Sequence, residues 1–389
     1  MPSGEEVKGC TMKTRAAVLR QTGAAMPFAQ SRPLDVVEVD LQPPGRDEVL
    51  VKVVAAGICH SDLSIINGDR PRPTPIVLGH EAAGVVEQVG DGVTDVQVGD
   101  HVVLLFVPSC GHCLPCAEGH PVQCEPAAAA NVAGTLLNGQ RRLSENGQPI
   151  NHFVGLAAFA EHTVVARQAV HKIDKRIPLE MAALFGCAVM TGVGTVVNAA
   201  VVQPGQSVAV VGMGGVGLSA IMGALAAGAT QVVAIDIADD KLAMARRMGA
   251  THTVNAKDAD AVEQVRKLSN GGVHHALEMV GAVAGLELAY KVTRKGGCTI
   301  TVGLPRISDQ IFSLTSAQMV AEERTLKGSY MGSCIPRRDV PRYIALYEAG
   351  RLPVEQLVTG YVTLDEINEG FDRLARGEAI RQIIRMGTV

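Results

Sequence analysis

The sequence predicts an α/β protein that combines a doubly wound parallel sheet with a β-rich, irregular, barrel-like domain. Three observations support this prediction. Residues from about 14 to 166 contain short apolar runs separated by turn residues, as antiparallel sheets do. Residues from about 189 to 330 alternate continuous apolar runs with helical segments, which is typical of a parallel sheet covered by helices. A glycine-rich turn, Gly212 to Gly217, joins one of these runs to the helix that follows.

Composition argues against several classes of protein. The chain has 389 residues, of which 47% are hydrophobic and 19% charged, so it can bury two cores of ordinary size. Its net charge is −4 and it has no long basic run, which argues against a nucleic-acid partner. Met1 to Thr14 are polar and lack the apolar core of a secretory signal, so we expect a loose extension and a cytoplasmic location. Nine cysteines in a reducing compartment indicate thiols or metal ligands rather than disulfides.

One long uncharged stretch raises the alternative of a membrane protein. Met181 to Ile235 contains no Asp, Glu, Lys or Arg. Asn198, the turn Gln203 to Gln206 and several glycines divide it into short pieces. We therefore expect a buried helix, a turn, a buried parallel strand and another buried helix, and no membrane partner.

The first part of the chain reads as strands joined by turns. Val49 to Val54, Gly84 to Val89 and His101 to Leu105 are apolar runs with strand character. Turn residues such as Pro43 to Gly45 and Gly90 to Gly92 lie between them. This pattern predicts an irregular antiparallel barrel.

The stretch from Cys59 to Glu81 contains a thiol, an imidazole and two carboxylates. Cys59 and His80 are ligands that zinc prefers, and a catalytic zinc takes three protein ligands and keeps one open position. Cys187 is the best candidate for the third ligand. Asp62 and Glu81 would then lie behind the ligands and orient them. Each residue alone is more simply explained as an ordinary buried side chain, but the combination favours a metal.

Four further cysteines form a second candidate zinc site. Their spacing is C-x2-C-x2-C-x7-C, which matches a closed structural site with four thiolates: Cys110, Cys113, Cys116 and Cys124. Two disulfides and a zinc ribbon that binds nucleic acid are the alternatives. The cysteine usage argues against the first and the charge against the second.

The glycine-rich turn has the context of a dinucleotide-binding fingerprint. It follows the apolar strand Ser207 to Val211 and precedes a helix, Leu218 to Ala227. Asp236 ends the next strand, nineteen residues after the last glycine, and would accept hydrogen bonds from a ribose. The turn and the helix N-terminus would bind a pyrophosphate through Gly212, Gly214, Gly215, Val216 and Gly217. The alternative is a turn that is rich in glycine only for packing.

The alternation of helices and strands then continues and predicts a Rossmann-type sheet. The expected elements are helix 239–248, strand 251–254, helix 261–268, strand 274–279, helix 285–292 and strand 298–302. The pattern weakens after Met331 and resumes with the helix Glu366 to Arg376 and the strand Ile380 to Arg385, which we expect to return to the first domain. We therefore predict a zinc-binding catalytic domain at 1–188 and 331–389 and a dinucleotide-binding domain at 189–330.

Together these motifs resemble the zinc-containing medium-chain alcohol dehydrogenases. The resemblance extends from about Thr14 to Arg385, and the retained segment Glu125 to Ile150 resembles the long-lobed, animal-type branch. Besides the cysteines and the glycine turn, the matching residues are Gly79 to Gly84, Gly90, Gly99, Asp100 and Ile367 to Phe371.

The resemblance implies an NAD-dependent enzyme with two zinc ions per chain that interconverts primary, apolar or aromatic alcohols and aldehydes. By position it implies that Ser61 takes the alcohol proton, that Asp62 and Glu81 lie beside the metal, and that the catalytic zinc binds Cys59, His80 and Cys187. The implied coenzyme contacts are His60 and Arg381 at the pyrophosphate, Asp236 and Lys241 at the ribose, and Thr191, Val302 and Leu304 at the nicotinamide. The implied pocket residues are Phe106, Phe153, Val154 and Leu304. The family also suggests a homo-oligomer, and the retained segment Glu125 to Ile150 favours a dimer over a tetramer.

Departures from the family leave two alternatives. The relay histidine of many members is replaced by Ser64. The glutathione-dependent formaldehyde branch has an acid where this chain has Arg70 and an arginine near Ala128, so that branch is the second choice. The alternative from another class is a non-catalytic NAD-binding protein, against which the intact set of Cys59, Ser61, His80 and Cys187 argues.

Overall fold

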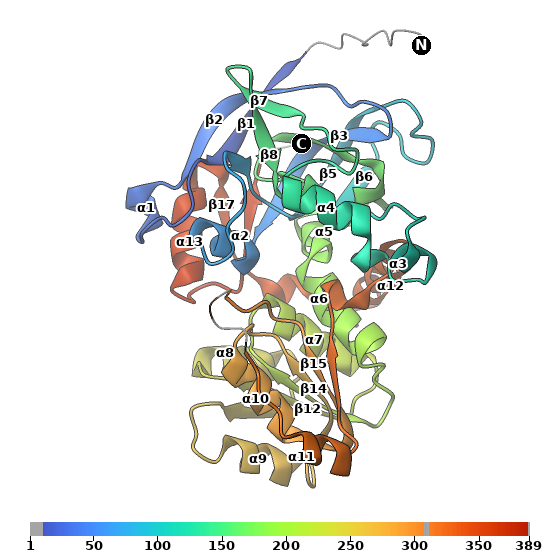
Figure 1. Ribbon diagram of the computed structural model, residues 1–389, viewed down its shortest axis with the longest axis vertical. Helices are drawn as coiled ribbons and strands as arrows, with labels where there is room; N and C mark the ends of the chain where they lie inside the picture. Colours follow the sequence, from blue (N-terminus) through green and yellow to red (C-terminus); the bar gives the residue numbers. More distant parts are fainter. Residues whose placement is uncertain (1–10, 307, 309–310, 388–389) are drawn as a thin grey trace. The chain divides into compact units, whose positions relative to one another are not determined.

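The computed structural model describes residues 11–306, 308 and 311–387. The chain divides into two compact units. The first comprises the residues up to Leu114, Cys124–Gly186 and those from Gly360 onward; the second comprises Pro115–Gln123 and Cys187–Thr359. One unit is rich in β-strands and the other is built on a parallel sheet, which confirms the predicted fold class (Figure 1). The domain boundaries given above remain a prediction.

The first unit contains a closed barrel. Strand β1 (Met12–Leu19) pairs along its whole length with β2 (Leu34–Leu41). The barrel is completed by β7 (Leu143–Glu145), β8 (Gln148–His152) and β4 (Ile76–Val77). Thr14 is buried and pairs with Val39, so the prediction of a loose extension is wrong for Met12 to Thr14. Polar and charged side chains at the start of β1 hide its alternating pattern. The rest of that predicted extension, up to Cys10, lies outside the described residues.

A second sheet of the first unit carries most of the predicted strands. Its strands, in order, are β10 (Val170–Ile173), β6 (His101–Leu105), β5 (Glu81–Val89), β3 (Glu48–Ile58), β18 (Arg381–Arg385) and β17 (Val358–Thr363), with β9 (His162–Ala166) also on β3. Strand β18 pairs antiparallel with β3, so Gln382 lies beside Ile58. The helices of this unit are α1 (Phe28–Ser31), α2 (His60–Ile66), α4 (Glu125–Ala133), α5 (Leu179–Ala183) and α13 (Ile367–Ala375), and α3 (Leu114–Ala117) lies at its boundary.

His152, at the end of β8, is a buried neutral histidine. Its Nε2 accepts a hydrogen bond from the Arg142 backbone N–H at 3.1 Å. Burial, assisted by the charges of Arg141 and Arg142, lowers the pKa of His152 to about 3. The folded protein therefore excludes a proton that the unfolded chain binds below pH ~6.5.

The unfolding free energy should accordingly fall as the pH drops below ~6.5, by about 2 kcal/mol at pH 5 from His152 alone. The sign follows from the depressed pKa, because only the unfolded state gains the proton in this range. The difference between the urea unfolding midpoints at pH 7 and pH 5 should be smaller in His152→Gln than in the parent. Equal differences would contradict this assignment.

The second unit is a six-stranded parallel sheet wound in two directions. The strand order is β13 (His252–Asn255), β12 (Gln231–Asp236), β11 (Ser207–Val211), β14 (Val273–Glu278), β15 (Thr293–Thr301) and β16 (Thr325–Gly328). The chain winds outward from β11 to β13 and returns to β14, which lies directly beside β11. The carboxyl ends of β11 and β14 therefore mark the switch point where such sheets bind ligands.

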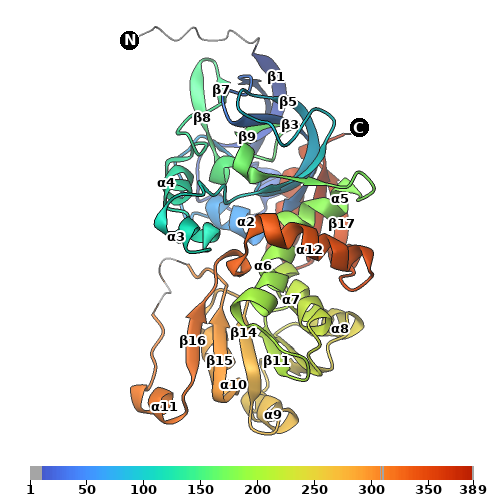
Figure 2. The same ribbon diagram turned by 90° about the vertical axis from the view of Figure 1, so that its right-hand side faces the viewer.

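Helices cover both faces of this sheet (Figure 2). The helices of the unit are α6 (Ala188–Gly194), α7 (Gly215–Ala226), α8 (Asp239–Arg247), α9 (Ala261–Leu268), α10 (Val283–Val292), α11 (Ser316–Ala321) and α12 (Pro336–Glu348), of which α7, α8, α9 and α10 pack on the strands. Val265 of α9 and Val292 of α10 join strand residues such as Val233 in one apolar core. Right-handed crossovers place α7 and α8 on the face of the sheet opposite to α9 and α10.

The long uncharged stretch folds as short buried pieces. It contains the end of α5, a 3-10 turn η4 (Leu184–Gly186), α6, a π-helical turn η5 (Thr195–Ala199), β11 and α7. Within the described part of the chain, no single helix is both long enough and apolar enough to span a membrane. One pair, Leu179–Gly186 with Ala188–Ala199, reaches that length and apolarity only when taken together, and it is bent by 53°.

Helix α12 is absent from the sequence prediction. Its sequence begins Pro336-Arg337-Arg338 and contains a second proline, Pro341, which together suggest a break in helical structure. Proline is nevertheless favoured in the first turn of a helix. The buried side chains of Val340, Tyr343 and Ile344 form the face that stabilises this helix.

Candidate active site

Two antiparallel strands bring Cys59 and His80 together. Cys59 follows β3 in extended conformation and caps α2, and His80 directly precedes β5. Because Ala56 pairs with Ala82, the end of β3 lies beside the start of β5. Both side chains are buried, with exposed fractions of 5% and 2%.

Cys187 joins this pair through a tightly packed glycine. A Cβ on Gly186 would lie 2.7 Å from the carbonyl oxygen of Leu104 and 3.3 Å from the Cα of Glu81. Only glycine fits there, and the next residue is Cys187. The candidate ligand atoms of Cys59, His80, Glu81 and Cys187 all lie within 4.8 Å of one another.

His80 is oriented as a metal ligand requires. Its Nδ1 lies 3.1 and 3.2 Å from the two carboxylate oxygens of Asp62, and Asp62 also accepts the Gly79 N–H at 3.0 Å. The remaining nitrogen, Nε2, is buried and makes no hydrogen bond with the described residues. A carboxylate behind an imidazole whose other nitrogen is unused is the usual arrangement at zinc sites.

The charge of the buried site also fits a cation. Burial raises the pKa of Asp62, and burial raises the pKa of Glu81 to about 7 although Arg381 opposes the shift. Burial lowers the pKa of His80, but Asp62 and Cys59 bring it well above its usual range. Burial therefore makes it costly to ionise these groups, and a divalent cation on two thiolates and an imidazole would favour their ionised forms.

Glu81 and Arg381 form an ion pair that the sequence did not predict. Arg381 Nε lies 3.6 Å from Glu81 Oε1, and both side chains are buried. A Cβ on Gly57 would lie 2.9 Å from this carboxylate, so glycine leaves the space that Glu81 occupies. The predicted contact of Arg381 with a coenzyme pyrophosphate stays a prediction.

Aromatic rings line the side of His80. Phe106 and Phe153 meet its ring edge-on, with centroids 5.4 and 5.6 Å away. Val154, next to Phe153, has φ of +46°, which is unusual for a β-branched residue and marks local strain. Three of the four predicted pocket residues therefore lie in or directly beside an apolar wall of the candidate metal centre.

The four-cysteine lobe forms a second cluster. The Sγ atoms of Cys110, Cys113, Cys116 and Cys124 lie within 4.8 Å of one another. Backbone N–H groups of Cys110 and Cys113 donate to the sulfurs of Cys124 and Cys110 at 3.2 and 3.3 Å. Burial opposes ionisation of Cys110, but N–H donors lower its pKa to about 7. This donor set fits a closed tetrahedral zinc site.

The glycine turn after β11 provides a phosphate cradle at the switch point. Gly212 has φ of +96°, and a Cβ on Gly217 would lie 1.8 Å from its carbonyl oxygen. At Gly214 a Cβ would meet nothing within 4 Å, so the turn faces open space there. Helix α7 begins at Gly215 without a side-chain cap, which leaves its N–H groups for an anion.

Asp236 ties this turn to the next strand. Its Oδ2 accepts the Met213 N–H at 2.6 Å and its Oδ1 accepts the Ala238 N–H at 3.0 Å. Lys241 lies in α8, which follows directly. Thr191 lies in α6, which packs closely on α7 because a Cβ on Gly192 would meet the Val216 carbonyl oxygen at 2.3 Å.

A residue that the sequence analysis missed connects the loop after β14 to the end of β15, just before Val302 and Leu304. The buried carboxylate of Glu278 accepts the N–H groups of Val280 and Gly281 at 2.6 Å and the Thr301 hydroxyl at 2.9 Å. A single acid at the end of an apolar strand, three residues before a glycine, was the available signal. His60 and Ser61, the first residues of α2, remain the predicted pyrophosphate contact and proton acceptor.

Comparisons with known proteins identify the family of the chain. Residues 45–175 match the alcohol dehydrogenase GroES-like domain and residues 215–349 the zinc-binding dehydrogenase domain. An alcohol dehydrogenase zinc-binding domain protein from Burkholderia ambifaria is 36% identical over 97% of this chain and 100% of its own, with a TM-score of 0.91. The chain belongs to the zinc-binding alcohol dehydrogenases.

Two further members of this family have similar structures. Benzyl alcohol dehydrogenase from Acinetobacter calcoaceticus is 33% identical, covers 97% of this chain and 100% of its own, and has a TM-score of 0.90. Alcohol dehydrogenase TADH from Thermus sp. ATN1 is 30% identical, covers 95% and 99%, and has a TM-score of 0.81. The chain is thus an NAD-dependent zinc alcohol dehydrogenase of the medium-chain type. Its place in the animal-type branch stays a prediction.

Proposed function

We propose that this dehydrogenase interconverts primary, apolar or aromatic alcohols and their aldehydes, with NAD as the hydride acceptor. The observation that carries the proposal is the buried cluster of Cys59, His80 and Cys187, in which the His80 ring lies beside the rings of Phe106 and Phe153. An apolar wall beside a metal ligand favours substrates whose carbon chain or ring is apolar. The similarity to a benzyl alcohol dehydrogenase supports the aromatic class.

The proposed roles divide between metal, coenzyme and protein. A zinc ion held by Cys59, His80 and Cys187 would act as a Lewis acid that makes the alcohol more acidic, and NAD would accept the hydride. The protein orients the ligands: Asp62 fixes the His80 ring, and Arg381 holds Glu81. Ser61 is the proposed acceptor of the alcohol proton. The Ser64 hydroxyl donates to the Ser61 carbonyl at 2.8 Å and, as an alcohol, does not titrate near neutral pH, so the proton passes to water.

Remaining assignments extend the proposal to the whole chain. We propose His60 and Arg381 at the pyrophosphate, Lys241 at the ribose, Thr191, Val302 and Leu304 at the nicotinamide, and four structural-zinc ligands: Cys110, Cys113, Cys116 and Cys124. A cytoplasmic homodimer, with a tetramer as the alternative, is the proposed assembly.

The test of the substrate class is a panel of alcohols assayed by NAD reduction. Benzyl alcohol and longer straight-chain primary alcohols should have the highest kcat/KM. The glutathione–formaldehyde adduct should be poorer by an order of magnitude or more. A preference for the adduct would overturn the proposal in favour of the formaldehyde branch.

Asp236 should decide between NAD and NADP. A 2′-phosphate near its buried carboxylate would meet a like charge, so we expect NAD to be preferred about a hundredfold, equivalent to ~3 kcal/mol. Asp236→Asn should shrink this preference, whereas Asp240→Asn, which changes an exposed carboxylate, should not. Equal kcat/KM for NAD and NADP in the parent would contradict the role of Asp236.

A further inference from the structure

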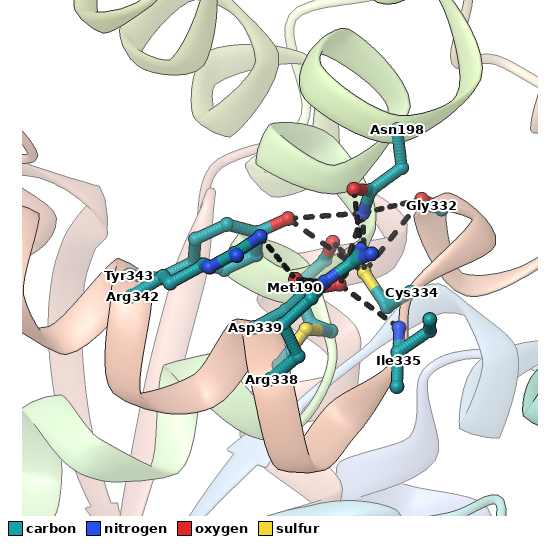
Figure 3. Close-up of polar contacts among 9 residues, drawn as sticks. All are labelled: Met190, Asn198, Gly332, Cys334, Ile335, Arg338, Asp339, Arg342 and Tyr343. Carbon is teal, nitrogen blue, oxygen red and sulfur yellow. Dashed lines mark hydrogen bonds and ion pairs between the residues drawn. The ribbon is translucent and has the colours of Figure 1, made fainter.

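A buried polar network connects α12 to α6 within the second unit (Figure 3). We call it the Asp339 network; its side chains are Asn198, Cys334, Arg338, Asp339 and Tyr343. Asp339 accepts the Ile335 N–H at 2.9 Å and the Asn198 amide at 3.0 Å. Arg338 donates to both oxygens of Asp339, at 2.6 and 2.9 Å, and to Asn198 Oδ1 at 2.7 Å.

The network encloses a backbone turn of unusual conformation. Met331, Gly332 and Ser333 have φ values of +49°, +65° and +51°. Side chains disfavour this left-handed region, so Met331 and Ser333 are strained and must be held there by their surroundings. Asn198 and Asp339 supply that restraint, because they bond to each other and Asp339 also fixes Ile335 just beyond the turn.

The turn lies directly on the backbone of α6. A Cβ on Gly332 would lie 2.7 Å from the carbonyl oxygens of both Met190 and Thr191, and 2.8 Å from the Cα of Gly194. The Cys334 thiol also donates to the Met190 carbonyl at 3.2 Å, which adds a second contact between this segment and α6. With no Cβ to separate the two backbones, a shift of the turn must shift α6.

Helix α6 carries two residues of the proposed site. Cys187 is its N-cap residue, and the Thr191 N–H donates to the Cys187 carbonyl at 2.9 Å. Thr191 is the proposed nicotinamide contact. The position of Thr191 therefore depends on a network whose charged residues, Arg338 and Asp339, lie in α12, seven and eight positions after Met331.

We propose that Asp339, together with Asn198, is a positioning residue for the nicotinamide end of the coenzyme: it fixes the 331–333 turn against α6 and thereby places Thr191. This inference rests on the coenzyme site proposed above. Its effect should be largest at the nicotinamide end, because the pyrophosphate cradle contacts α6 at Val216 but is also held by the bond from the Met213 N–H to Asp236.

The test compares two ligands that differ at that end. NADH contains the nicotinamide and ADP-ribose lacks it, so calorimetric Kd values for both separate the two halves of the site. Asp339→Asn keeps the size of the side chain but removes the negative charge that accepts hydrogen bonds from Arg338 and the Ile335 N–H. It should weaken NADH about tenfold while ADP-ribose changes less than about twofold. Val265→Ala, which opens a cavity in the core of the same unit, should lower the melting temperature without changing the ratio of the two Kd values.

Asn198→Ala provides the same comparison if Asp339→Asn does not fold. Equal weakening of NADH and ADP-ribose in these variants, or no change in either ligand, would overturn the inference. A parent protein that binds neither ligand would instead overturn the coenzyme site, and this inference with it. The expected result is a higher ratio of the NADH Kd to the ADP-ribose Kd in Asp339→Asn or Asn198→Ala, and an unchanged ratio in Val265→Ala.

Discussion

Cys187→Ala is expected to abolish turnover while leaving a folded protein that still binds NADH. Loss of one thiolate from the cluster of Cys59, His80 and Cys187 removes a ligand of the Lewis acid, which contributes several kcal/mol to the transition state, so the rate should fall about a thousandfold or more. Zinc content should drop by about one equivalent per chain. The glycine cradle at Gly212–Gly217 does not involve Cys187, so NADH fluorescence titration should detect a complex.

Cys298→Ala is the matched control for that variant. Cys298 lies in β15, is half-buried and belongs to neither candidate zinc cluster among the described residues. It should keep two zinc equivalents and parental kcat. If Cys187→Ala retained substantial activity, Cys187 would not be a ligand of the catalytic metal.

Cys113→Ala should act on stability instead of chemistry. A closed four-thiolate site contributes folding free energy directly, so opening it should lower the melting temperature by about 10 °C or more and reduce solubility. The remaining folded molecules should still turn over, because Cys113 lies outside the cluster that contains His80.

Together the two variants test the division of roles. Cys187→Ala should change activity more than melting temperature, and Cys113→Ala the reverse. Loss of activity in both, with unchanged melting temperatures, would show that the two clusters are wrongly assigned.

Features encoded in short stretches of sequence were predictable. The spacing of Cys110, Cys113 and Cys116 already places three thiols in one loop. The glycines of Gly212 to Gly217 indicate a tight turn between a strand and a helix. Strand β6 and helix α9 match their predicted limits because apolar periodicity is a local signal. The fold class followed from the order of these signals.

Features that depend on distant parts of the chain were not predictable. The ion pair of Glu81 and Arg381 exists because β18 pairs with β3, far away in the sequence. Glu278 looks like any acid until its carboxylate is seen to accept the hydroxyl of Thr301, 23 positions later. Asp339 lies in a helix that two prolines conceal, and its partner Asn198 is 141 positions earlier. In each case a buried charge is explained only by a tertiary partner.

The most direct measurement is the transfer of a labelled hydride. The protein with its zinc in place would be incubated with NAD and benzyl alcohol deuterated at the reacting carbon, and the coenzyme analysed by mass spectrometry. The account predicts deuterium on the reduced nicotinamide in amounts equal to the benzaldehyde formed, and none with Cys187→Ala. Failure to transfer deuterium from any alcohol of the panel, in a protein that holds two zinc ions and binds NADH, would contradict it.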